Sequence, residues 1–126
     1  MPLVIYSLLA LLGLAVGSFL NVVIARLPAG KPLTGRSRCP KCRATIRWYD
    51  NVPLISFLLL GGRCRGCRRP ISWQYPAVEL VTAALFLLAA AAHSTAGWGG
   101  YELAWLARDL AAISVLIVVF VVDLRH

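Results

Sequence analysis

The 126-residue sequence has few acidic residues and several long stretches with no Asp, Glu, Lys or Arg. Only five Asp and Glu stand against thirteen Lys and Arg, which leaves a formal net charge of +8. No charged residue lies between positions 2 and 25, and none lies between positions 110 and 122. A chain that is 60% hydrophobic and contains such runs is too apolar for an ordinary soluble domain. We therefore expect a membrane protein.

The basic residues are concentrated in one segment. Eleven of the thirteen Lys and Arg lie from Arg26 to Arg69, where Asp50 is the only acid. Aromatic residues interleaved with these arginines give the segment the chemical means to contact phosphates and to stack on bases. The same charges, however, are typical topology determinants next to membrane spans, and they pair with anionic lipid headgroups. We therefore expect membrane lipids as partners and no nucleic acid.

Three apolar segments are long enough to cross a membrane, since about 20 helical residues span ~30 Å of hydrocarbon. They are residues 1–25, residues 76–94 and residues 103–126, and a turn at residues 95–102 joins the last two. The predicted fold class is an all-α polytopic membrane protein with three transmembrane helices. A fourth apolar run, residues 52–60, is too short to cross as a helix. It either packs in the loop domain or lies on the membrane surface.

The charge distribution predicts the orientation of these helices. Short loops rich in Lys and Arg next to membrane spans are cytoplasmic as a rule. The loop of residues 26–75 and the C-terminus are therefore expected in the cytoplasm, and the N-terminus and the 95–102 turn in the periplasm. A cleaved signal peptide is the alternative for the first segment, but such a peptide carries basic residues before its apolar core. Here the basic residues come only after it.

Four cysteines form the strongest local motif. Cys39 and Cys42 in CPKC, and Cys64 and Cys67 in CRGC, are the only cysteines of the chain. Two CxxC pairs at this separation can close a tetrahedral four-sulfur site for structural Zn²⁺. Two disulfides are the alternative, and a redox role is a weaker one, but the reducing cytoplasm favours free thiolates and metal. The sequence thus predicts a small zinc-ribbon-like cytoplasmic loop domain between the first two membrane helices.

Small and polar residues lie on one side of the first predicted helix. Gly13 and Gly17 form a small-xxx-small pair, and Asn21 follows one turn later. Close packing against another helix is the favoured interpretation, with Asn21 as a hydrogen-bonding residue of the interface. A direct catalytic use of Asn21 is the alternative.

Several segments, in order along the chain, resemble one family. GSFLNVVIARLP (residues 17–28), the two CxxC pairs, IRWYDNVPLISFLLLGGRCRGC (residues 46–67) and RRPISWQYPAVEL (residues 68–80) are similar to the N-terminal half of the type IV prepilin peptidases. The resemblance implies a multi-pass aspartic endopeptidase of the bacterial inner membrane. Its partners would be type IV prepilins and type II secretion pseudopilins, whose leader peptides it would cut at the cytoplasmic face. Bifunctional members also methylate the new N-terminus with S-adenosylmethionine.

The resemblance also implies a role for Asp123. In the family the first catalytic aspartate lies at the cytoplasmic end of a transmembrane helix, and VVFVVDLRH fits this context. The second catalytic aspartate belongs to a Gly-x-Gly-Asp motif on a later helix, and these 126 residues contain no such motif. We therefore expect the N-terminal portion of a prepilin peptidase, without its C-terminal half and inactive alone. A non-catalytic membrane scaffold or prepilin-binding protein that keeps the zinc loop is the alternative.

Two further details concern the loop. No glycine-rich nucleotide loop follows a predicted strand, so no residue is assigned to S-adenosylmethionine. Arg68 stands directly after Cys67, where many relatives carry glycine. This departure is expected to change how the second CxxC turn is formed and to leave its ligands intact.

Overall fold

Helices dominate the computed structural model, which describes residues 2–95 and 99–126; residues 96–98 of the predicted 95–102 turn lie outside the described part. The three long helices are α1 (Pro2–Arg26), α3 (Gln74–Ser94) and α4 (Gly100–Arg125). The loop between α1 and α3 contains the 3-10 helix η1 (Trp48–Asp50) and the short helix α2 (Ile55–Leu59).

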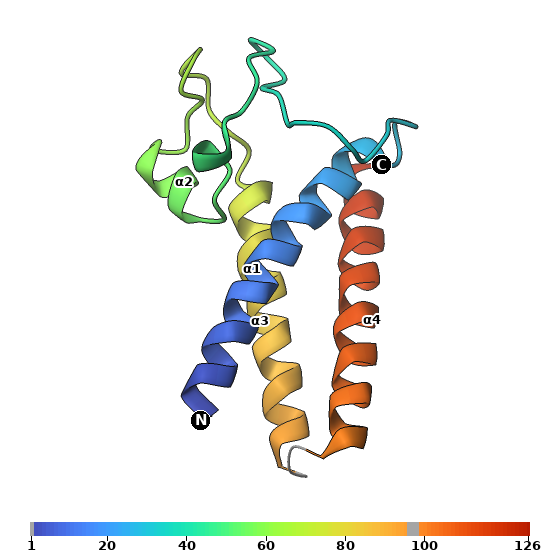
Figure 1. The fold of residues 1–126 in the computed structure, drawn as a ribbon. Coiled ribbons are helices and arrows are strands. Elements are labelled where there is room, and N and C mark those ends of the chain that lie inside the picture. The colour runs from blue at the N-terminus through green and yellow to red at the C-terminus, as the bar shows by residue number, and fades with distance from the viewer. Residues whose placement is uncertain (1, 96–98) are drawn as a thin grey trace.

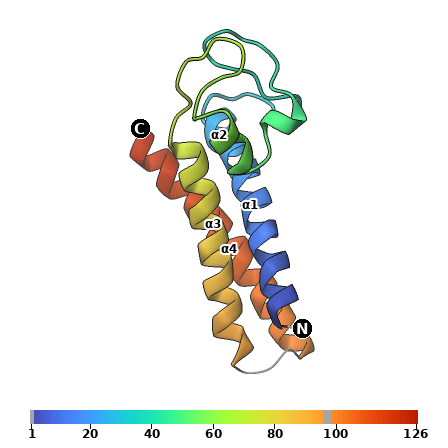
Figure 2. The ribbon, with the colours of Figure 1, turned by 90° about the vertical axis from the view of Figure 1, so that its left-hand side faces the viewer.

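The three long helices form a bundle with the loop at one end (Figure 1). The C-terminus lies at this loop-side end and the N-terminus at the opposite end, as the turned view also shows (Figure 2). Each of α1, α3 and α4 is long and apolar enough to cross a membrane. The prediction of an all-α, multi-pass membrane protein with three spans is confirmed.

Helices α1 and α3 are in close contact through the two glycines predicted at a helix interface. A Cβ on Gly13 would lie 2.5 Å from the Cα of Ala83, and a Cβ on Gly17 would lie 2.7 Å from the Cα of Glu79. Two backbones approach this closely only where a side chain is absent. The small-xxx-small prediction is confirmed, and the partner is another helix of the same chain.

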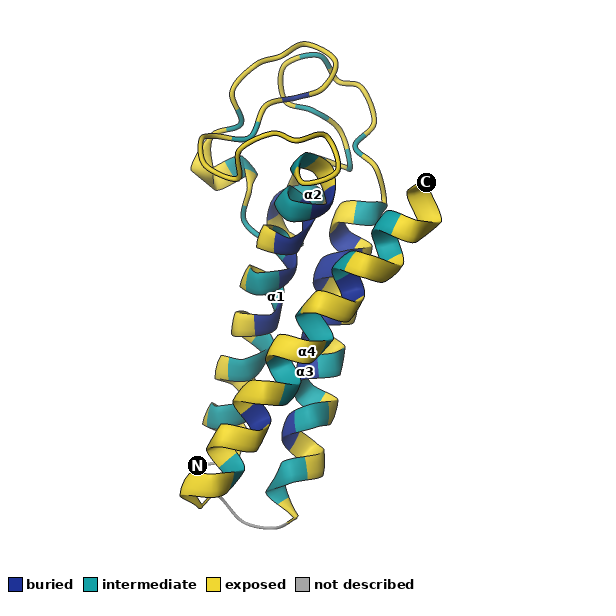
Figure 3. Cartoon of the chain, turned by 90° about the vertical axis from the view of Figure 1, so that its right-hand side faces the viewer, coloured by how far each residue is buried: buried dark blue, intermediate teal, exposed yellow. Residues whose placement is uncertain are grey.

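Helix α4 packs more loosely against the other two. Its Ile117 joins a small buried cluster with Leu20 and Ile24 of α1 and Val78 of α3. Most of its remaining surface is exposed, whereas the buried residues line the inner sides of α1 and α3 (Figure 3). Large apolar side chains on the outside of a bundle suit contact with lipid rather than water. On α4 they include Val115, Leu116, Val119 and Phe120.

Polar contacts tie the bundle together at both ends. At the loop-side end, Asn21 Nδ2 donates to the Tyr75 carbonyl over 3.1 Å, in agreement with its interpretation as an interface residue. At the opposite end, His93 of α3 bridges to α4. Its Nε2 lies 2.8 Å from an Asp109 oxygen and its Nδ1 lies 3.3 Å from a Glu102 oxygen. Buried polar groups in a membrane protein need such internal partners, because hydrocarbon offers none.

Candidate functional site

The four cysteines come together at the tip of the loop. Their sulfur atoms all lie within 4.8 Å of one another, and the Sγ atoms of Cys39 and Cys67 are 3.7 Å apart. Those of Cys42 and Cys64 are 3.8 Å apart, and none of the four is in a disulfide. Four thiolates at ~2.3 Å around one tetrahedral ion lie about 3.8 Å apart, so the arrangement matches a four-sulfur metal site.

Each CxxC pair sits in the same type of turn. The N–H of Arg43 donates to the Cys39 carbonyl over 2.9 Å, and the N–H of Arg68 donates to the Cys64 carbonyl over 3.0 Å. Both arginines adopt left-handed backbone conformations, with φ of 58° and 60°. This conformation costs a non-glycine residue about 1–2 kcal/mol, which explains why glycine suits the position of Arg68. Arg68 nonetheless adopts the conformation that the turn requires, and the sulfurs of Cys64 and Cys67 stay within the cluster.

The electrostatics of the cluster favour a bound cation. The backbone N–H of Cys42 donates to the Cys39 sulfur and, with the N–H of Lys41, lowers the pKa of Cys39 to about 6. For Cys42, the N–H of Ala44 lowers the pKa, but partial loss of water and the three neighbouring sulfurs outweigh it and raise the pKa to about 11. The Cys39 thiol therefore ionises readily, whereas the Cys42 thiol resists ionisation, because the negative charges of neighbouring thiolates repel one another. A divalent ion would remove that repulsion, so the four cysteines can bind a metal ion.

An ion pair connects the cysteine cluster to the aromatic part of the loop. Arg65, between Cys64 and Cys67, donates to both carboxylate oxygens of Asp50, with its Nη2 2.8 Å from Oδ1. The Asp50 side chain is only 10% exposed, and Arg65 holds the pKa of this carboxyl below its usual range. The Arg65 guanidinium also lies 5.6 Å from the centre of the Tyr49 ring. Sequence reasoning missed this pair, because nothing local to Asp50 points to a partner fifteen residues away.

Glu79 holds the loop to the membrane helices. Its carboxylate accepts the backbone N–H of Leu54 over 2.9 Å, and the residue is only 7% exposed. Leu54 precedes α2 and has a positive φ of 59°. Glu79 therefore positions the loop through this hydrogen bond. It lies at the same end of the bundle as Asp123.

Asp123 lies near the end of α4, on the same side of the bundle as the loop (Figure 1). Its side chain is exposed. Asp50, Glu79, Glu102 and Asp109 all have hydrogen-bond partners. Within residues 2–95 and 99–126, Asp123 is the one acidic residue for which no such partner is found.

One family model matches most of this chain. The family model described as Bacterial Peptidase A24 N-terminal domain matches residues 11–93, which includes all four cysteines and the α1–α3 contact. The chain belongs to this family. The matched part of this peptidase A24 N-terminal domain ends before α4, so Asp123 lies beyond it.

Curated relatives extend the likeness beyond the domain. A prepilin leader peptidase/N-methyltransferase of Myxococcus xanthus is 49% identical over 119 residues, which are 94% of this chain and 33% of the relative. One of Klebsiella pneumoniae is 52% identical over an alignment of 90 residues that covers 66% of this chain and 40% of the relative. A type 4 prepilin-like proteins leader peptide-processing enzyme of Escherichia coli is 42% identical over an alignment of 134 residues, gaps included, that covers 90% of this chain and 47% of the relative. The chain thus spans about a third to a half of the length of these relatives. No solved structure matched it.

Proposed function

We propose that this chain forms the N-terminal part of a prepilin peptidase of the bacterial inner membrane, which removes leader peptides from type IV prepilins and pseudopilins. The observation that carries the proposal is the 49% identity to the Myxococcus xanthus prepilin leader peptidase/N-methyltransferase over 94% of this chain. The name of that relative also includes an N-methyltransferase activity. The proposed activity therefore extends to methylation of the new N-terminus with S-adenosylmethionine.

Asp123 would supply one carboxylate of an aspartic-protease pair. Its exposure near the end of α4, together with the lack of a hydrogen-bond partner among the described residues, leaves it free for this task. Two carboxylates held close together share a proton, because both cannot ionise at that distance. The ionised one accepts a proton from the attacking water, while the protonated one polarises the scissile carbonyl. The second carboxylate would come from a Gly-x-Gly-Asp segment of the relatives' C-terminal half.

Zn²⁺ is the metal proposed for Cys39, Cys42, Cys64 and Cys67. Four sulfur ligands leave no open coordination position, so the ion would fold the loop and would take no part in the chemistry. Binding of structural zinc contributes on the order of 10 kcal/mol to the folding of small peptides, enough to order a loop with little core of its own. The backbone N–H groups that donate to Cys39 support this role, since they stabilise the thiolate form that binds metal.

The proposed topology places the loop and Asp123 in the cytoplasm. The basic residues from Arg26 to Arg69 support this orientation through the positive-inside rule. A reporter fused at Gly35, which is exposed in the loop, should therefore report a cytoplasmic location. A periplasmic signal would overturn both the orientation and the compartment argument for zinc.

Incubation of the purified chain with a prepilin in lipid vesicles tests the assignment of Asp123. Because a single carboxylate cannot perform both roles of the pair, we expect no leader cleavage by residues 1–126 alone. Cleavage that persists in Asp123→Ala would overturn the assignment of Asp123. The Asp50→Ala variant is the matched control, since Asp50 is paired with Arg65 in the loop.

A further inference from the structure

The short helix α2 presents an apolar face that no part of the described chain covers. Ile55, Leu58 and Leu59 are 58%, 74% and 81% exposed. The segment around them, residues 51–62, contains no charged residue. We infer that α2 and the cavity beside it form a lipid-contact surface that enters the membrane leaflet on the loop side of the bundle.

The depth of α2 along the bundle supports contact with lipid. The residue before α2, Leu54, is hydrogen-bonded to Glu79, and the Cα of Glu79 packs against Gly17. Gly17 lies nine residues before α1 ends at Arg26, which is about 13 Å along the helix axis at ~1.5 Å per residue. Directly after Glu79, Leu80 and Val81 are half-exposed, as lipid-facing residues of a span are. Figure 1 accordingly shows α2 beside the first turns of α3 and below the tip of the loop.

Several polar groups of this segment have hydrogen-bond partners within the protein, as membrane surroundings require. Pro53 has no N–H to satisfy. The N–H of Val52 donates to the Ser56 hydroxyl over 2.9 Å, and that hydroxyl donates to the Tyr49 carbonyl over 2.6 Å. The N–H of Leu54 would otherwise point into apolar surroundings, and the Glu79 carboxylate accepts it. These internal partners are compatible with a segment at the membrane, where hydrocarbon offers none.

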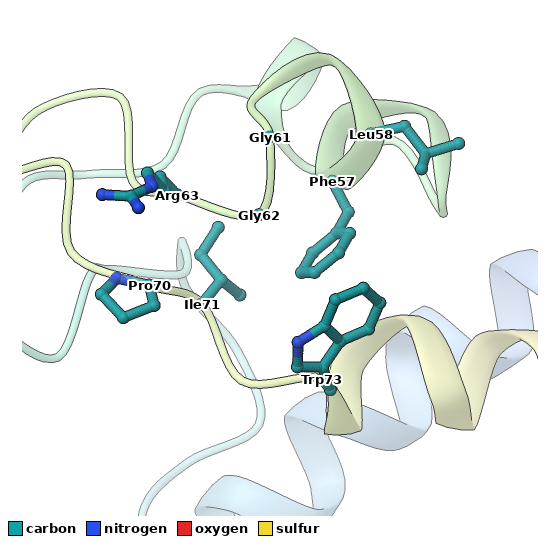
Figure 4. Close-up of a pocket in the computed structure, with 8 residues that line it drawn as sticks. All are labelled: Phe57, Leu58, Gly61, Gly62, Arg63, Pro70, Ile71 and Trp73. Carbon is teal, nitrogen blue, oxygen red and sulfur yellow. The ribbon is translucent and has the colours of Figure 1, made fainter.

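The cavity next to α2 has the composition of a phospholipid site. It measures about 400 Å³ and lies between the end of α2 and the start of α3, with Phe57, Ile71 and Trp73 on its walls (Figure 4). The rings of Phe57 and Trp73 meet edge to face with centroids 5.0 Å apart. Arg63 adds an exposed guanidinium to this lining. Apolar walls suit the upper part of an acyl chain, Trp prefers the membrane interface, and an arginine attracts an anionic headgroup.

Photocrosslinking in vesicles of phosphatidylcholine and phosphatidylglycerol tests whether lipid covers α2. p-Benzoylphenylalanine is introduced in place of Leu58 and, in a second variant, in place of Leu59. The matched control carries it in place of Lys41, which is exposed between two cysteines at the tip of the loop. After irradiation, mass spectrometry measures adducts with lipid and with protein for all three variants.

We expect lipid adducts at positions 58 and 59 with a yield roughly fivefold or more above that at position 41, because of these loop positions only the two on α2 enter the leaflet. Equal yields at the three positions would overturn the inference. So would crosslinks from positions 58 and 59 to a protein surface in place of lipid, since α2 would then be a protein docking site.

A second arm tests the headgroup part of the inference. With the crosslinker at position 58, Arg63→Gln should lower the ratio of phosphatidylglycerol to phosphatidylcholine adducts by up to about fivefold, which corresponds to ~1 kcal/mol per arginine near an anionic surface. Arg36→Gln, a change of another exposed arginine in the loop, should leave the ratio unchanged. An unchanged ratio in Arg63→Gln would overturn the role of Arg63.

Discussion

Enlarging Gly17 should loosen the contact between α1 and α3. A Cβ at this position would lie 2.7 Å from the Cα of Glu79 and 3.2 Å from both Thr82 Oγ1 and the Val78 carbonyl oxygen. Carbon atoms pack at about 3.5–4.0 Å, so the two helices would have to separate by about 1 Å. The nearest atom belongs to the backbone of α3, and no change of side-chain rotamer can relieve the contact.

The expected loss of stability in the Gly17 variants follows from two opposing effects. Overpacking of a tight interface costs about 1–3 kcal/mol, while replacement of glycine by alanine in a helix recovers up to about 1 kcal/mol. Gly17→Ala should therefore destabilise the bundle by about 1 kcal/mol. Gly17→Val, with two more carbons and a less favourable helix propensity, should cost about 2–3 kcal/mol.

Reversible unfolding in mixed micelles, followed by circular dichroism as the fraction of denaturing detergent rises, measures these differences. Ala15→Val is the matched control, because Ala15 is exposed on the same helix and the added carbons face outward. The control should change the free energy of unfolding by less than about 0.5 kcal/mol. If Gly17→Val unfolds at the same detergent fraction as Ala15→Val, the close contact between α1 and α3 is not present.

Three further predictions concern the loop. Metal analysis of the purified chain should find one zinc ion per chain, and the double variant Cys39→Ser with Cys64→Ser should lose it; an unchanged metal content would argue against the four-sulfur site. Because Arg65 lowers the pKa of Asp50, the stability from this pair is fully present above the unfolded pKa of about 3.9 and is lost only as the pH falls through the lower folded value. Asp50→Asn should lower the free energy of unfolding by about 1 kcal/mol, a small value because Arg65 is exposed to solvent. This difference from the wild type should stay constant from about pH 6 to about pH 8, and a difference that changes over this range would contradict the ion pair of Asp50 with Arg65. Glu79→Ala should cost about 1–3 kcal/mol in the same unfolding assay because the Leu54 N–H loses its acceptor, while Glu79→Gln keeps an acceptor oxygen and should cost less; equal losses would show that this hydrogen bond is not what holds α2.

Features that depend on local composition could be predicted from the sequence. The three spans follow from long uncharged runs, and the cysteine cluster follows from two CxxC pairs in a chain with no other cysteine. The α1–α3 contact follows from Gly13 and Gly17 on one helix face. In each case the residues that carry the signal lie close together in the sequence or are of a type rare enough to stand out.

Features that depend on distant pairs could not be predicted. Glu79 meets Leu54 across twenty-five residues, and its partner is a backbone N–H that carries no side-chain signature. Asp109 forms an ion pair with the adjacent Arg108 at 2.7 Å, but its bond to His93 on another helix had no signal in the sequence. For the same reason the sequence left open whether the run at residues 52–60 packs in the loop or lies on the membrane.

The most direct test of the proposed function is leader cleavage by a chimera in which residues 1–126 are joined to the part of the Myxococcus xanthus relative that follows the matched region. In cells that lack their own prepilin peptidase, this chimera should process a prepilin, and the same chimera with Asp123→Asn should not. Processing that survives Asp123→Asn would contradict the catalytic role of Asp123. If the unmodified chimera reaches the membrane in normal amount but leaves the prepilin uncut, the chain is a non-catalytic member of the family.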